Sequence, residues 1–176
     1  MQRDDVTGSN QVILDVNIDK KDKMKVRYIF IDGNNNLKLS KIKGGLFKKG
    51  VFSKTHEAGT VGSFLKSKKF TPERYEKDKQ NLIEKYNELG YRDMTIVRDS
   101  IINHDENHVN IYIKIDEGQK YYIRNITWVG NTVVTAEYLN RLLGMKGGDV
   151  YNQKELRKRL SEDEDAVGNY YWNNGY

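Results

Sequence analysis

The chain has 176 residues, of which 37% are hydrophobic and 31% are charged, and its formal net charge is +5. This length suits one domain or two small modules with thin cores. The positive excess is small and scattered, whereas nucleic-acid binders usually concentrate it in one stripe, so no nucleic-acid partner is expected. The absence of cysteine excludes disulfides and thiolate metal sites, and no apolar run reaches the roughly 18–20 residues of a transmembrane helix.

The N-terminal segment contains one alternating stretch. Residues 2–10 are polar and do not resemble a secretory signal, so we expect a soluble piece of a longer protein. Residues 11–18 (QVILDVNI) alternate between apolar and polar side chains, which predicts a strand. We interpret residues 1–20 as the last strand of a preceding module.

A second strand and a short helix are predicted next. Residues 24–31 are rich in β-formers, and the turn-favouring residues Asp32, Gly33 and Asn34 follow. A short helix is predicted from Ser40 to about residue 46, although two glycines lower its helical propensity.

Residues 47–70 are rich in Lys, Gly and Ser and predict an irregular insertion or a mobile loop. Four phenylalanines stand among the lysines, and such a mixture can bind anionic lipid headgroups or single-stranded nucleic acid. An exposed loop tethered by a few apolar contacts is the plainer interpretation. The candidate membrane or anion contacts are Lys48, Lys49, Lys54, Lys66, Lys68 and Lys69.

A long helix is predicted after this insertion. Thr71 is a suitable N-cap and Pro72 fits the first helical position. Gly90 can supply the left-handed residue that ends the helix. Its apolar stripe at three- and four-residue spacing consists of Tyr75, Leu82, Ile83, Tyr86 and Leu89.

Two strands and a hairpin loop follow. Residues 94–102 and 109–115 alternate, and the second stretch places Val109, Ile111, Ile113 and Ile115 on one face. Residues 103–108 predict the loop. They include His104 and His108, but a zinc-protease motif needs two His one helical turn apart with Glu after the first. Since Asp105 takes that position between strands, we predict a plain hairpin and no metal.

The second half of the chain repeats the first. Residues 26–34 align with residues 123–131, so that Arg27 matches Arg124 and the pair Gly33-Asn34 matches Gly130-Asn131. The repeat predicts a second strand over residues 123–128 and a helix that carries Tyr138, Leu139, Leu142 and Leu143.

A longer helix is predicted to close the second copy. Asn152 and Glu155 have capping-box spacing at its start, and the glycine-rich residues 144–148 predict the connection that leads to it. Residues 161–165 form an acidic run on this helix, which we interpret as a solvated face, with a basic partner patch as the alternative. Both long helices are followed by Gly-Tyr, at residues 90–91 and 175–176.

This order of elements resembles the POTRA family and is most similar to the POTRA modules of BamA-type outer-membrane protein assembly factors of the Bacteroidota kind. The pattern covers roughly residues 11–176. The long insertion departs from the compact pattern of the family. The residues that carry the resemblance are Glu117-Gly118, residues 121–132, residues 144–152 and the two Gly-Tyr pairs.

The resemblance implies an α+β fold of tandem β-α-α-β-β modules. Each complete module would have a three-stranded mixed sheet packed under two antiparallel helices, with residues 109–115 central and residues 94–102 at the edge. We expect a complete module over residues 21–119, with its insertion around residues 47–70. Residues 120–176 would be the truncated N-terminal part of the next module.

The resemblance also implies a location and partners. The segment would lie in the periplasm of a Gram-negative bacterium, attached to its own membrane β-barrel downstream. Its partners would be nascent outer-membrane proteins and the accessory lipoproteins of the assembly machinery. Because the second module would lack its hairpin, a strand-swapped dimer of this fragment is a further prediction, with residues 11–18 as the donor strand.

The edge strand is the candidate binding site. Its unpaired backbone groups can accept an extended client peptide as a further strand. Alternatively, charges such as Arg92, Arg98 and Asp99 only keep the edge soluble. The candidate residues are Met94, Thr95, Ile96, Val97, Arg98, Asp99 and Ser100.

The sequence therefore favours a periplasmic scaffold that aids outer-membrane protein assembly by edge-strand pairing. It contains no Ser/His/Asp, Cys/His or paired-carboxylate constellation, so we expect neither an enzyme nor a cofactor. The alternative function is a basic adaptor that binds an anionic membrane surface or nucleic acid through residues 48–69. The linker of residues 116–120 is short, so neighbouring modules should touch.

Overall fold

The first part of the fold is an α+β unit. The computed structural model describes residues 23–44, 50–57 and 69–175. The elements of this unit are the strand β1 (Lys25–Asp32), the helices α1 (Leu39–Lys43) and α2 (Pro72–Glu88), and the hairpin strands β2 (Thr95–Asp105) and β3 (His108–Asp116).

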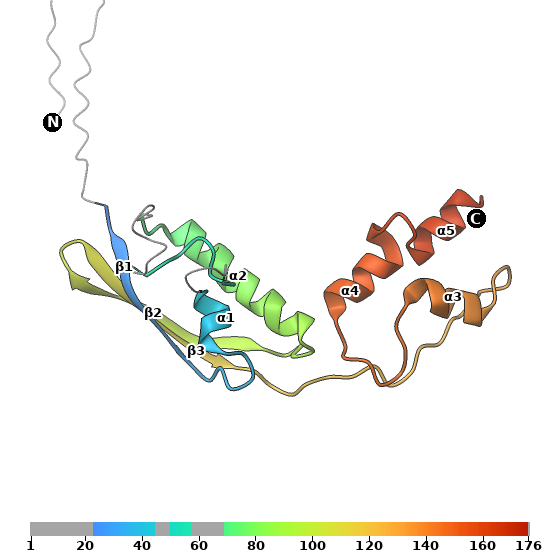
Figure 1. The fold of residues 1–176 in the computed structure, drawn as a ribbon, viewed down its shortest axis with the longest axis horizontal. Helices are drawn as coiled ribbons and strands as arrows, with labels where there is room; N and C mark the ends of the chain where they lie inside the picture. The colour runs from blue at the N-terminus through green and yellow to red at the C-terminus, as the bar shows by residue number, and fades with distance from the viewer. Residues whose placement is uncertain (1–22, 45–49, 58–68, 176) are drawn as a thin grey trace, which may run out of the picture.

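These strands form one mixed sheet in the order β1-β3-β2. The central strand β3 pairs in parallel with β1 and antiparallel with β2. Helix α2 lies along one face of the sheet (Figure 1). The predicted α+β class is therefore confirmed, with residues 109–115 central and β2 at an edge.

The core of this unit lies between α2 and the sheet. The apolar residues of β3 that the alternation predicted are all buried, as are Tyr75, Leu82 and Tyr86 on α2. Burial of each large side chain contributes about 1.5–3 kcal/mol. Further buried members of this cluster are Val26, Ile29, Leu37, Ile42, Phe52, Tyr91 and Met94.

The β2–β3 hairpin is tighter than predicted. The strands extend to Asp105 and restart at His108, so only two residues connect them. The prediction of a loop over residues 103–108 is therefore wrong at both ends. Residues 103–105 keep pairing because the register continues through Asn103↔Val109 and Asp105↔His108.

The described part of the insertion packs tightly. Residues 51–57 contain no helix, as the irregular composition predicted, but they are not a loose loop. Phe52 is fully buried, and its backbone N–H donates to the Ile42 carbonyl at 2.8 Å. Glu57 forms a bridge with Val26, and its carboxylate accepts from the backbone N–H of Ile29 at 2.7 Å.

Asp78 of α2 fixes this segment. Its side chain is fully buried and accepts from the backbone N–H groups of Ser53 at 3.0 Å, Lys54 at 2.9 Å and Thr55 at 2.6 Å. Position 78 falls on the apolar stripe between Tyr75 and Leu82. A carboxylate can occupy this position because backbone donors replace the water that it loses.

The second unit contains the helices α3 (Ala136–Leu143), α4 (Gln153–Arg157) and α5 (Val167–Asn173), with a π-helical segment η1 (Lys158–Glu162) between α4 and α5. Its buried residues include Leu139, Leu143 and Val167, with Trp128 and Tyr171 packed against them. Within the described ranges, no helix is long and apolar enough to cross a bilayer.

The corners of the two units have the same geometry, as the repeat predicted. Gly33 and Gly130 have φ angles of 88° and 79°. The Asn34 side chain donates to the Leu37 carbonyl at 3.0 Å, and the Asn131 side chain donates to the Val134 carbonyl at 3.1 Å. The sequence repeat therefore reflects a structural repeat at these corners.

Two predictions for the second unit are wrong. Residues 123–128 do not form a strand. Within the described part of the chain, the bridge Tyr122↔Val150 lies just before them, and among residues 123–128 Ile123 exchanges backbone hydrogen bonds with residues 148 and 149. The predicted long helix is interrupted after η1, where Asp163 takes an extended conformation with ψ at 152°. The acidic run therefore lies at a break, where Asp163 faces Lys158 at 3.5 Å.

The insertion should depend on Asp78. We expect Asp78→Ala to lower the free energy of unfolding by about 3 kcal/mol, because it leaves three backbone donors without their acceptor. Urea unfolding measures this change. The control Asp32→Ala removes a carboxylate whose side chain is 77% exposed and should cost about 0.5 kcal/mol or less. Equal losses in the two variants would contradict this role.

Candidate partner-binding surfaces

The outer edge of β2 is regular over only part of its length. The pairing with β3 shifts between Ile96 and Arg98 and again between Asn103 and Asp105. Such bulges disturb the ladder and turn an edge away from a new partner. The regular edge is therefore residues 98–103.

The predicted edge residues have different surroundings. Met94 precedes the strand and is 4% exposed, so it belongs to the core, and Ile96 packs against this core. Val97 is exposed at the first bulge, while Thr95 is also exposed and Ser100 is half-buried. The edge of β2 thus brings together only part of the predicted site.

Asp99 is held from the helix side of the sheet. Its carboxylate accepts from the Tyr75 hydroxyl at 3.3 Å and from Lys79 Nζ at 2.7 Å. Burial and the neighbouring Asp99 carboxylate raise the pKa of Tyr75 well above its ordinary value. Asp99 therefore anchors β2 to α2.

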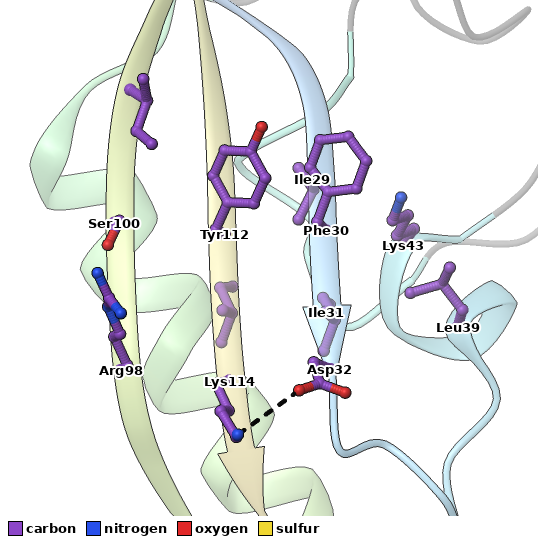
Figure 2. A pocket seen from close by; sticks show the side chains of 12 residues that line it. Ile29, Phe30, Ile31, Asp32, Leu39, Lys43, Arg98, Ser100, Tyr112 and Lys114 are labelled. Atoms are coloured by element: carbon purple, nitrogen blue, oxygen red, sulfur yellow. Dashed lines mark ion pairs between the residues drawn. The ribbon is translucent and has the colours of Figure 1, made fainter.

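The sheet face opposite α2 carries exposed aromatic side chains. Tyr28 and Phe30 of β1 are 44% and 46% exposed, and Tyr112 of β3 is 40% exposed. The Phe30 and Tyr112 rings stack with centroids 4.8 Å apart and an interplanar angle of 11°. Arg98 and Lys114 lie on the same face (Figure 2). The alternating side-chain direction along β1 could have predicted this aromatic surface, because positions 28 and 30 face outward and both are aromatic.

The predicted lysine cluster falls largely outside the described residues. Lys48, Lys49, Lys66 and Lys68 lie there, while Lys54 and Lys69 are described. The backbone N–H of Lys54 is bound to Asp78. Phe52 is buried and Phe70 packs against the core, so these two rings of the predicted mixture are engaged inside the fold.

The histidines of the hairpin make local contacts. His108 Nδ1 lies 2.8 Å from the Asp105 carboxylate, and His104 packs edge-on to the Tyr28 ring. A hydrogen bond from the backbone of Asn107 and another with His108 lower the pKa of Asp105. Across the described segments, no group of three His, Asp or Glu side chains is arranged to hold a metal ion.

The junction between the units is made by backbone and ionic contacts. The Tyr121 N–H donates to the Gly90 carbonyl at 2.9 Å. A Cβ at position 90 would lie 2.7 Å from Val150, so glycine permits this close approach as well as its φ of 93°. Lys154 of α4 pairs with Glu88 of α2 at 2.8 Å. The predicted contact between neighbouring units is therefore present.

Comparisons with known proteins agree with this architecture. The POTRA family, described as the surface antigen variable number repeat, matches residues 24–118 and 121–176. The chain therefore belongs to the POTRA family.

One known protein is similar to this chain in sequence, and one solved structure is similar to it in fold. Outer membrane protein assembly factor BamA of Neisseria meningitidis serogroup B is 26% identical over 162 residues, which are 90% of this chain and 19% of that protein. The crystal structure of Haemophilus influenzae BamA POTRA3-5 shares the fold, with a TM-score of 0.52 and 19% identity over 79% of this chain and 52% of that one. The chain thus spans only part of either relative.

The junction should depend on pH. Burial raises the pKa of Glu88, but hydrogen bonds from Lys154 and Lys85 outweigh it, so the pKa lies below its ordinary value of 4.5. The hydrogen bond with Glu88 raises the pKa of Lys154 above 10.5. The contact is therefore fully present between these two ordinary values. It is lost as pH falls through the lowered pKa of Glu88 or rises through the raised pKa of Lys154.

We expect Lys154→Ala to widen the distance distribution between spin labels at positions 76 and 137, which the cysteine-free chain allows. The free energy of unfolding should change by about 1 kcal/mol or less, because the pair is partly exposed. Lys146→Ala is the control, since this exposed lysine makes no ion pair within the described residues. An unchanged distribution in Lys154→Ala would show that the pair does not restrain the junction.

Proposed function

We propose that this chain is a non-catalytic interaction segment from the periplasmic part of an outer-membrane protein assembly factor. Membership of the POTRA family and the similarity to BamA support this role. Its partners would be nascent outer-membrane β-barrel proteins and accessory lipoproteins, and the segment would precede its own membrane barrel.

Pairing at the β2 edge is the proposed binding mode. The observation that carries it is the position of β2 at the border of the sheet, with a regular stretch over residues 98–103. Main-chain hydrogen bonds recognise backbone geometry more than sequence, which suits a receptor for many β-rich clients. The bulge at Val97 would limit the length of the added strand and keep binding transient.

Two consecutive modules would work as one arm. We propose the division of the chain into modules at residues 21–119 and 120–176. Residues 1–20, which we expected to contribute the last strand of a preceding module, lie outside the described residues. The contacts at Gly90 and Glu88 support a restrained orientation of the two units. Such restraint would present successive edges in a defined geometry to a client.

A strand-forming peptide tests the edge. A peptide of about ten alternating residues matches one membrane-spanning strand in length. We expect it to shift the amide resonances of residues 98–103 in the isotope-labelled chain. The same peptide with alternate backbone nitrogens methylated should bind at least about tenfold more weakly. It loses several ladder hydrogen bonds worth about 0.5–1.5 kcal/mol each.

The methylated peptide is a matched control because its side chains are unchanged. Equal affinity of the two peptides would exclude strand pairing. Resonance shifts confined to the lysine-rich residues 48–69 would instead favour the basic adaptor, and steep salt dependence of binding to anionic vesicles or an oligonucleotide would support it. The structure gives this rival less support, since Phe52 is buried.

A further inference from the structure

A groove crosses the sheet face that α2 leaves open. It has a volume of about 640 Å³ and runs from α1 across β1 and β3 to β2. Figure 2 shows Leu39 and Lys43 at the α1 end, Phe30 and Tyr112 in the middle and Arg98 at the β2 end. Since neighbouring strands are about 4.8 Å apart, the groove spans about 10 Å across the strands.

The aromatic side chains form a wall in this groove. Phe30 and Tyr112 stack against each other at an interplanar angle of 11°, so each ring uses one of its faces on the other. The Phe30 ring also lies 5.9 Å from the Tyr28 ring. Leu39 of α1 lines the same groove as Phe30. This arrangement suits apolar side chains that insert beside Phe30.

The charge of the groove is positive at the β2 end. Lys43 pairs with Glu57 at 2.7 Å, and Lys114 lies 3.9 Å from Asp32. Within the described ranges, Arg98 makes no ion pair, and its side chain lies on the open face. A guanidinium is a strong hydrogen-bond donor to a carboxylate, because its N–H groups form a planar fork that matches the two carboxylate oxygens.

We propose that this groove binds an acidic amphipathic segment of a partner protein. Apolar side chains of the segment lie between Phe30 and Leu39, and a carboxylate pairs with Arg98. The segment crosses the strands and therefore contacts side chains on the sheet face. A client strand at the β2 edge would instead pair with the backbone. The two proposed surfaces meet at Arg98, whose backbone belongs to the β2 edge and whose side chain lines the groove.

The test uses the whole chain and a synthetic helix-forming peptide with a Leu/Phe stripe and glutamates on its flank. We expect resonance shifts at Phe30, Lys43, Arg98 and Tyr112. The affinity, measured by fluorescence anisotropy, should fall about tenfold in Phe30→Thr and several-fold in Arg98→Gln. Threonine keeps the β-propensity of β1, and thermal unfolding reports whether each variant folds.

Two matched controls isolate the groove. Val129→Thr removes an apolar side chain that is 94% exposed elsewhere on the chain, and Arg92→Gln removes an exposed arginine outside the groove. Neither should change the affinity. A peptide with lysine in place of every glutamate should bind at least about tenfold more weakly, since it repels the Arg98 end.

Three results would overturn the proposal. The first is an affinity that Phe30→Thr and Arg98→Gln leave unchanged. The second is a set of resonance shifts that falls only along the amides of residues 98–103, which would assign the peptide to the edge. The third is a dimer in sedimentation velocity that Phe30→Thr abolishes, which would make a second copy the occupant. If only the edge-pairing test fails, the groove proposal is not affected, because the two tests use different peptides.

Discussion

The Glu117 carboxylate connects three parts of the first unit. It is 6% exposed and accepts from the Asn36 backbone at 2.9 Å, from the Asn36 side chain at 2.6 Å and from the Tyr86 hydroxyl at 2.7 Å. These contacts join the end of β3, the corner after β1 and the last turns of α2. Burial and the hydrogen bond to Glu117 raise the pKa of Tyr86 far above its ordinary value. No cation pairs with Glu117 among the residues that the structure describes. Its burial is tolerated because each hydrogen bond to the carboxylate contributes about 1.5–3 kcal/mol.

The same contacts set the course of the chain into the second unit. Gly33 lies against the end of β3, where a Cβ would meet the Ile115 carbonyl oxygen at 2.1 Å. With this end fixed, the linker leaves the sheet beside the C-terminal turn of α2, where Gly90 accepts the Tyr121 N–H. The corner, the helix end and the junction therefore depend on one another. A change at Glu117 would alter both the first unit and the placement of the second.

Local patterns predicted most of the fold, and distant partners explain the rest. Alternation identified β3, and the Thr71-Pro72 start and Gly90 delimited α2 correctly. The sequence could not show why Asp78 and Glu117 are buried, because their donors lie far away in the chain. Residues 123–128 repeat the pattern of β1, but a strand also needs a partner along its length, and local pattern does not supply one. The sequence could not show the bulge at Val97, because it depends on the register with β3.

A module of this size has too few elements to cover both faces of its sheet. Helix α2 and the insertion anchored by Asp78 bury one face, and the other stays in water with Tyr28, Phe30 and Tyr112 on it. Scattered apolar side chains on a surface are ordinary. Here a stacked pair of rings shares a groove with an arginine that makes no ion pair among the described residues. The two proposed surfaces would also differ in what they recognise. Backbone pairing at the edge would accept many sequences, whereas binding in the groove would require apolar and acidic side chains together.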